Sequence, residues 1–291
     1  AVTLSDGAAL DAPTIGSCDL TAGGACVVSA DLTTGTHDLV ARFAGTTEFA
    51  PSVSAASAFR VTDTTTTVVT GSSPNPSTYG ELVTVTVAVA SASGIPTGSV
   101  SLSDGSTTVG TCTLDVAGTC TVTSREIRAG VRSLVARYAG DGIFLASASE
   151  AHAHEVFVTE TATSVSTSLN PSEYGQPVDL TVRVDATTGV PTGTVTITDG
   201  TLGVVVGTCS LSSGACDLPT NTLAVGGHAL TALYAGDANF VPAASSALTQ
   251  TTIPAPTTTS VTSSLNPSVF GRSVTVTVRV DATTGVPTGL V

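Results

Sequence analysis

Lysine is absent from the chain, and its absence removes one kind of covalent reinforcement. All nine basic residues among the 291 are arginine. Isopeptide cross-links join a lysine amine to an asparagine or aspartate side chain, so none can form. Any covalent reinforcement must therefore come from the six cysteines.

Tryptophan and methionine are also absent, aromatic residues make up 4% of the chain, and no apolar run reaches 18 residues. A helix needs about 20 consecutive apolar residues to cross a bilayer, so we expect no membrane insertion. Apolar residues still amount to 41%, which is enough for packed cores. With so few aromatics, those cores must consist of Val, Leu, Ile and Ala.

Positive charge is scarce, with 9 basic residues against 22 acidic ones and a net charge of -13. Such a chain repels phosphate backbones, so no nucleic-acid partner is expected. Acidic residues such as Asp141, Asp199 and Asp237 stand singly among Gly and Thr. We interpret them as solvated turn residues that keep the protein soluble.

What the sequence does contain is a repeat of 95 or 96 residues, which decides the domain count. Gly-Ile-Pro-Thr-Gly at 94–98 returns as Gly-Val-Pro-Thr-Gly at 189–193 and 285–289. Asn-Pro-Ser at 75–77, 170–172 and 266–268 precedes Tyr79-Gly80, Tyr174-Gly175 and Phe270-Gly271. One repeat is therefore the length of one small domain.

This repeat divides the chain into four parts. Residues 63–159 and 160–254 are complete copies, residues 1–62 are the back part of a copy, and residues 255–291 are the front part of another. The joints are rich in Thr and Pro, which suits short extended connectors. We expect the partial copies to expose unpaired strand edges, with head-to-tail association as a risk.

Period-two patterns predict strands in each copy. Val178, Leu180, Val182 and Val184 alternate with polar residues, which buries one face of a strand. Val195 and Ile197 continue this pattern, as do Leu230, Ala232 and Tyr234. Turn signals separate about seven short strands per copy, and no helical periodicity is present. The expected fold is all-β, with a two-sheet sandwich in each copy.

The motifs together resemble a known family. Asn-Pro-Ser-Glu-Tyr-Gly at 170–175, Gly-Val-Pro-Thr-Gly at 189–193 and Tyr-Ala-Gly-Asp-Ala-Asn-Phe at 234–240 are similar to the bacterial Ig-like repeat domains found in tandem in surface and secreted proteins. The resemblance implies tandem immunoglobulin-like β-sandwiches arranged end to end, used as a spacer or adhesive stalk, without catalytic residues. The first copy departs from it, since it has Gly45-Thr46 where the other copies have Gly-Asp.

The six cysteines form three close pairs, one in each of the first three copies: Cys18 and Cys26, Cys112 and Cys120, Cys209 and Cys216. Turn-like residues separate each pair, so we expect local disulfides across a hairpin. Metal binding usually needs Cys-x2-Cys spacing with further ligands, and redox catalysis needs Cys-x-x-Cys at a helix start. Paired structural cysteines indicate an oxidising compartment, which favours an extracellular or cell-wall location.

Two weak metal candidates remain. His152 and His154 share a strand face and could hold a transition metal, but no third ligand is evident and we expect two solvent-facing side chains. Asp141 and Asp237 could bind calcium, yet Gly-Asp-x-Asn is also an ordinary turn. We predict no metal and no cofactor.

No nucleophile elbow, phosphate-binding loop or glycosidase carboxylate pair is present, so we predict that the chain is not an enzyme. The predicted function is a passive stalk in a bacterial surface or secreted protein, whose neighbours are further repeats. The alternative is an adhesin-type module that binds a carbohydrate or a host protein, but the exposed aromatic patch expected of such a module is not evident.

Overall fold

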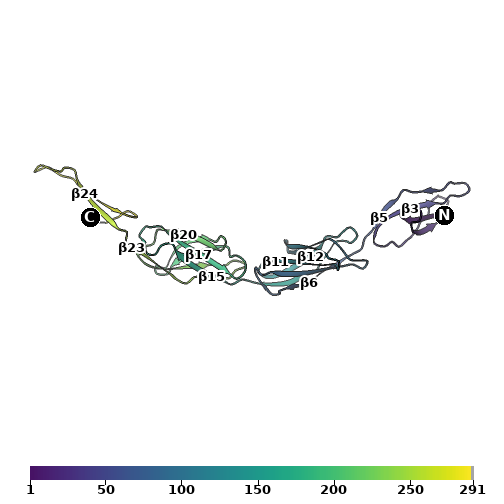
Figure 1. The fold of residues 1–291 in the computed structure, drawn as a ribbon, viewed down its shortest axis with the longest axis horizontal. Helices are drawn as coiled ribbons and strands as arrows, with labels where there is room; N and C mark the ends of the chain where they lie inside the picture. The colour runs from purple at the N-terminus through teal and green to yellow at the C-terminus, as the bar shows by residue number, and fades with distance from the viewer. Residues whose placement is uncertain (290–291) are drawn as a thin grey trace. The chain divides into compact units, whose positions relative to one another are not determined.

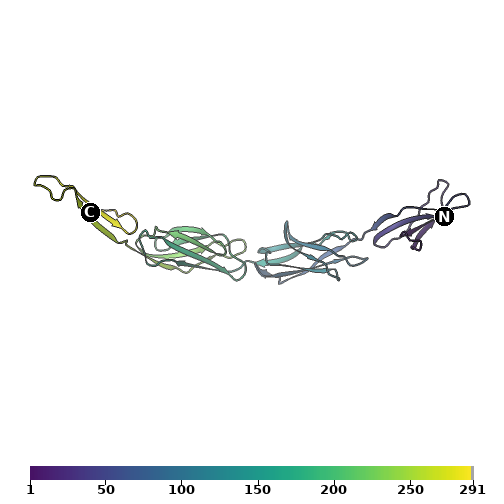
Figure 2. The same cartoon turned by 45° about the horizontal axis from the view of Figure 1, so that its top comes forward.

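The computed structural model describes residues 1–289, which form strands and loops without a helix (Figures 1 and 2). The all-β prediction is therefore confirmed. No helix in this described part is long and apolar enough to cross a membrane. The chain divides into two compact units: the first contains Ala1–Ser77, Leu82–Ile127 and Val131–Val156, and the second contains Thr78–Glu81, Arg128–Gly130 and the residues from Phe157 onward.

The first unit contains three sheets, and nearly all neighbouring strands run antiparallel. The first sheet has the order β2 (Thr14–Cys18), β1 (Val2–Asp6), β3 (Gly35–Phe43), β4 (Ser52–Val53), and β5 (Ser57–Val61) also pairs with β3. The second has the order β10 (Thr107–Thr113), β9 (Ser99–Asp104), β12 (Gly130–Tyr138), β14 (His152–Phe157), β7 (Ser77–Thr78), and β13 (Ser147–Ala148) pairs with β12. The third has the order β11 (Thr119–Ser124), β8 (Val83–Ala90), β6 (Thr66–Ser73).

The second unit repeats this pattern. One sheet has the order β15 (Thr161–Thr167), β17 (Val178–Ala186), β20 (Ala215–Thr220). The other has the order β16 (Ser172–Glu173), β23 (Leu248–Ile253), β21 (Gly226–Tyr234), β18 (Thr194–Asp199), β19 (Val204–Ser210), and β22 (Ala243–Ala244) pairs with β21. A separate hairpin pairs β24 (Thr257–Ser263) with β25 (Val276–Ala282).

The cores form because alternate side chains of facing sheets point inward. In β17, Val178, Leu180, Val182 and Val184 are buried, while Asp179 and Arg183 between them are exposed. The opposite sheet contributes Val195 and Ile197 from β18, and Leu230, Ala232 and Tyr234 from β21. These are the inward-facing positions that the period-two pattern predicts.

The hairpin of β24 and β25 has the register of β15 and β17. Val261 lies opposite Val278 as Val165 lies opposite Val182. Yet Val278 is 45% exposed, whereas Val182 is fully buried. The difference arises because Val182 packs against the facing sheet of its sandwich, and β24 and β25 form a two-stranded sheet on their own.

Candidate functional site

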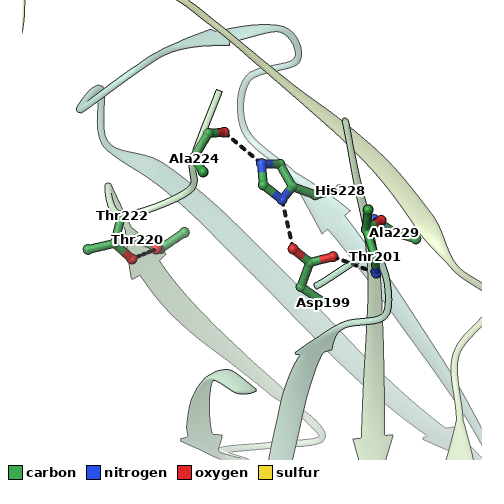
Figure 3. Close-up of polar contacts among 7 residues, drawn as sticks. All are labelled: Asp199, Thr201, Thr220, Thr222, Ala224, His228 and Ala229. Atoms are coloured by element: carbon green, nitrogen blue, oxygen red, sulfur yellow. Dashed lines mark hydrogen bonds and ion pairs between the residues drawn. The ribbon is translucent and has the colours of Figure 1, made fainter. Parts of the chain in front are cut away.

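Asp199 and His228 form a buried polar contact in the second unit. Asp199 is the last residue of β18, and His228 lies on the adjacent strand β21. The His228 Nδ1 atom lies 2.7 Å from Asp199 Oδ2, and its Nε2 atom lies 2.7 Å from the Ala224 carbonyl oxygen (Figure 3). The exposed fractions of the two side chains are 3% for His228 and 1% for Asp199.

Both ring nitrogens of His228 face acceptors, one a carboxylate and the other a carbonyl. Two donated hydrogen bonds require both nitrogens to carry protons, so this geometry favours the imidazolium form of the ring. Burial alone lowers the pKa of His228, but the hydrogen bonds to Asp199 and Ala224 outweigh it and raise the pKa above its ordinary value. Burial likewise acts to raise the pKa of Asp199, and its bonds with His228 and the Thr201 amide lower it instead. The two groups form a buried ion pair.

The same arrangement recurs in the first unit. His37 Nδ1 contacts Asp6 Oδ2, and His37 Nε2 lies 2.7 Å from the Thr33 carbonyl oxygen. The pKa of His37 is raised, first by its bond with Asp6 and then by the bond with Thr33. In the sheet that contains β9 and β12, an arginine takes the place of the histidine, since Arg132 Nη1 lies 3.4 Å from Asp104 Oδ2. Each pair joins the last residue of one strand to the strand beside it.

The structure corrects our interpretation of Asp199 as a solvated turn residue. The side chain is buried because it continues the inward series Val195, Ile197, Asp199 along β18. His228 occupies the same face of β21 as Leu230 and Ala232. The alternation of buried and exposed residues along β18 already placed Asp199 on the buried face. A buried aspartate needs a polar partner, however, and the sequence does not tell which strand lies beside β18 and provides that partner.

The pair predicts an uncommon pH dependence of stability. The raised pKa of His228 means that its contribution is complete below the unfolded value of about 6.5 and is lost as the pH rises through the folded value. The lowered pKa of Asp199 means that its contribution is complete above about 3.9 and is lost as the pH falls further. We therefore expect amide protection in β18 and β21 to be greatest between about pH 4 and 6.5 and to decrease towards pH 8. Hydrogen exchange followed by mass spectrometry measures this.

The matched control for this prediction is His228→Arg, which copies Arg132 and carries a charge that does not titrate in this range. In that variant, we expect the decrease between pH 6.5 and 8 to disappear. An unchanged decrease in the variant would contradict the assignment to His228. The readout must be local, because His154 titrates with the opposite sign: its pKa is lowered, mainly by burial and secondarily by His152.

His152 and His154 do not face solvent as a pair, contrary to our expectation. His154 is fully buried, with Nδ1 hydrogen-bonded to Ser72 Oγ at 2.9 Å and Nε2 hydrogen-bonded to Ser77 Oγ at 3.0 Å. His152 Nε2 is hydrogen-bonded to the same Ser72 oxygen at 3.1 Å. His154 lies inward because it shares the buried face of β14 with Val156. Both histidines therefore have structural hydrogen-bond partners.

The calcium candidates Asp141 and Asp237 also have internal partners. The amides of Asn239 and Phe240 donate to Asp237 Oδ1 at 2.7 and 3.1 Å, and Thr192 Oγ1 donates to Oδ2 at 2.8 Å. Asp141 repeats this with the amides of the following turn and with Thr97 Oγ1 at 2.6 Å. Burial acts to raise the pKa of Asp141, and these bonds lower it. The carboxylates tie two loops together.

In the first copy, a hydroxyl group accepts the hydrogen bonds that this carboxylate accepts in the other copies. The amides of Glu48 and Phe49 donate to Thr46 Oγ1 at 3.2 and 3.1 Å. A calcium ligand could not be exchanged for a lone hydroxyl in this way, whereas a turn acceptor can. The departure at Thr46 therefore supports the turn interpretation.

This gives a second prediction, on the Asp237 turn. Asp237→Ala is expected to lower the free energy of unfolding by about 1 kcal/mol, because it removes an acceptor of hydrogen bonds. Asp237→Thr, which copies Thr46, is expected to retain more than half of that stability. Urea denaturation with and without millimolar calcium measures both. A calcium-dependent increase of the midpoint that Asp237→Thr abolishes would contradict the turn role.

The cysteines are disulfide-bonded as Cys18–Cys26, Cys112–Cys120 and Cys209–Cys216, and Cα atoms within each pair lie 5.8 or 5.9 Å apart. Contrary to our expectation, the last two bridges do not cross a hairpin. Cys209 lies on β19 and Cys216 on β20, which are edge strands of different sheets. The chain changes sheet within the turn that separates them. The bridge therefore joins the two layers of the sandwich.

Residues 1–289 contain no group of three or more His, Cys, Asp or Glu residues that could hold a metal ion. A groove of about 700 Å³ lies beside the Cys209–Cys216 bridge, lined by Thr181, Asp217, Leu218 and neighbouring residues. Thr181 Oγ1 donates to Asp217 Oδ1 at 2.7 Å there, so this carboxylate also has an internal partner.

The sequence and the fold were compared with those of known proteins. No curated protein sequence matches it at a significant level. Solved structures with similar folds include fibronectin(III)-like modules of Clostridium thermocellum CbhA, at 14% identity over 65% of this chain and 94% of that one, with a TM-score of 0.26. The Escherichia coli adhesin FdeC is similar at 15% identity over 75% of this chain and 74% of that one, with a TM-score of 0.28.

A biofilm-associated protein, through its BSP domain, is similar at 20% identity over 65% of this chain and 30% of that one, with a TM-score of 0.24. The match of the sequence to a family model is more specific than these structural similarities. Residues 69–159 and 163–253 each match the family described as bacterial Ig-like domain, group 3. Because the two matches span more than half of the chain, the chain belongs to the bacterial Ig-like domain family, group 3.

Proposed function

We propose that the chain is a non-catalytic spacer or stalk within a bacterial cell-surface or secreted protein. One observation carries this: the polar side chains that could have formed a site are used to hold the sandwiches together. Asp237 and Asp141 accept bonds from their own turns, His154 is bonded to two serines, and Asp199 is paired with His228. Because these groups are hydrogen-bonded within the protein, they hold its loops and strands in place.

The division into repeats at 1–62, 63–159, 160–254 and 255–291 is part of this proposal. The family matches at 69–159 and 163–253 support the two complete copies. The mechanism is mechanical, because each sandwich has a closed apolar core and a disulfide that joins its layers. The disulfides also support an extracellular or cell-wall location, since they persist in oxidising compartments.

The proposal is tested by a binding screen of the full chain against arrays of glycans and of extracellular host proteins. A spacer is expected to give no saturable binding. Saturable binding that is lost when Thr181 and Asp217 in the groove are replaced would overturn the spacer role and support an adhesin. Saturable binding that survives these replacements would overturn it equally and place the binding surface elsewhere.

A mechanical measurement tests the positive side of the proposal. When the full chain is pulled, we expect separate unfolding events for the two complete copies. Reduction should lengthen each event by about 20 Å, because the seven or eight residues closed by each disulfide are then free to extend. Unfolding without discrete events would contradict stiff, independent sandwiches.

A further inference from the structure

The segment Thr78–Glu81 belongs to the second unit, although the sequence repeat places it in the copy that ends at residue 159. Its backbone is held on both sides. The Tyr79 amide donates to the Phe157 carbonyl oxygen at 2.9 Å. The Tyr79 carbonyl oxygen accepts from Thr159 Oγ1 at 2.8 Å and also from Thr188 Oγ1.

The Tyr79 ring completes an apolar contact in the second unit. It meets the Phe240 ring edge to face, with 5.3 Å between centroids and an interplanar angle of 88°, a favourable geometry for two aromatic rings. Phe240 is only 2% exposed, and Tyr79 packs against the core cluster to which Phe240 belongs. Tyr79 therefore contributes to the core of a copy that follows it in the chain.

Gly80 allows the closest approach in this contact. It has a φ of +82°, and a Cβ added to it would lie 2.6 Å from the Gly189 amide nitrogen and 3.0 Å from the Thr188 carbonyl carbon. Both obstacles are backbone atoms that cannot move aside alone. Only glycine fits at position 80 while Tyr79 stays in place.

The same contact occurs a second time, one repeat later. The Tyr174 amide donates to the Ile253 carbonyl oxygen at 2.8 Å, and Thr284 Oγ1 donates to the Tyr174 carbonyl oxygen. Thr283 Oγ1 adds a bond of 2.7 Å to Glu173 Oε2. Tyr174 and Thr284 hold the repeat positions of Tyr79 and Thr188, so equivalent residues make the contact twice.

The exposed fraction of the three aromatic residues increases as fewer residues of the following repeat contact them. Tyr79, which meets Thr188, Gly189 and Phe240, is half-buried. Tyr174, which meets Thr284, is 49% exposed. Phe270 holds the third such position and is fully exposed, at 105%.

We infer that the aromatic–glycine pair of each repeat is a plug that docks into a socket on the following repeat. The socket is the Thr-Gly pair at 188–189 and Phe240 of that repeat, and Thr159 at the joint adds a hydrogen bond to the plug. Phe270-Gly271 is then a plug of the same kind, whose socket is a further repeat of the same family. This goes beyond the spacer role, because the docking holds whether or not the repeats bind a ligand.

Two glycines provide a matched test in the full chain. Gly80 and Gly271 both have a φ of +82°, but a Cβ at Gly271 meets nothing within 4 Å. Gly80→Ala and Gly271→Ala therefore introduce the same backbone strain, and only the former blocks docking. We expect Gly80→Ala to increase amide exchange at residues 159 and 241 at least tenfold, and Gly271→Ala to leave these amides unchanged. Equal effects of the two variants would overturn the inference.

A second pair of variants distinguishes a loss of docking from misfolding of the whole repeat. Tyr79→Ala should accelerate exchange at the same amides while those of β17 keep their protection, and Phe270→Ala should change neither group. Thr188→Ser should behave as wild type, because it keeps the hydroxyl donor, whereas Thr188→Val should resemble Tyr79→Ala. Wild-type protection in both Tyr79→Ala and Thr188→Val would overturn the docking.

The identity of the partner is tested in a longer chain in which residues 160–254 are inserted again after residue 254, with the inserted copy of Tyr174 replaced by phenylalanine so that nitration at this position reports on Tyr174 alone. Tyr174 then faces a complete socket. We expect its nitration by tetranitromethane to be at least tenfold slower than in the original chain. An unchanged rate would show that a repeat does not provide the socket for this plug.

Discussion

Replacing His228 with leucine is expected to lower the free energy of unfolding of the second unit by about 3 kcal/mol, because removing one partner leaves the other charge buried and unpaired. The Asp199 carboxylate would keep the Thr201 amide as a donor at 2.9 Å but would lose the imidazolium. The measurement is urea denaturation at pH 6, where the raised pKa of His228 and the lowered pKa of Asp199 both favour the charged forms. This is the largest effect that we expect from a single substitution.

Two variants separate the pair from the loss of a side chain. His228→Arg should regain most of the stability, since Arg132 and Asp104 form the corresponding contact. The double variant Asp199→Leu with His228→Leu should also lose much less than His228→Leu alone, because apolar residues can replace a buried ion pair at little cost. If the single and double leucine variants are equally unstable, the unpaired charge is not the cause.

Replacing both Cys209 and Cys216 with alanine is expected to lower the free energy of unfolding by roughly 2 to 3 kcal/mol. The estimate follows from the entropy that a closed loop of about eight residues removes from the unfolded chain. Urea denaturation at pH 6 under oxidising conditions measures the loss. A reducing agent should produce a loss of similar size in the second unit of the wild-type chain and no further loss in that unit of the variant, because Cys209–Cys216 is the bridge of that unit.

The position of this bridge makes a more specific prediction. Because β19 and β20 belong to different sheets, the double alanine variant should lose amide protection in both edge strands while the central strands β17 and β21 change less. A bridge within a hairpin would affect one sheet only. Loss confined to a single sheet would therefore contradict the placement of the bridge between layers.

The strands and the core could be predicted from the sequence because burial on one face has period two. Val178 to Val184 and Leu230 to Tyr234 show this directly. The same period also holds for two polar residues, since Asp199 continues the buried phase of β18 and His154 that of β14. A polar residue in a buried phase predicts a partner, but alternation along one strand does not tell which strand lies beside it.

The cysteine pairs were close enough in sequence to predict local disulfides, but not to show that the chain changes sheet between Cys112 and Cys120. Spacing fixes the loop length and leaves the hydrogen-bond partners of each strand open. Strand β10 pairs with β9, and β11 pairs with β8. The order of strands depends on packing between distant segments, which no short motif encodes.

The joined edges have a consequence for folding in a tandem array. Neighbouring repeats with similar sequences can exchange strands during synthesis, and unpaired edges are where a foreign strand adds. Cys112–Cys120 and Cys209–Cys216 bind two such edges to each other at the point where a strand from another repeat would have to enter. We therefore expect oxidation to hinder the entry of a strand from a neighbouring repeat at these two edges.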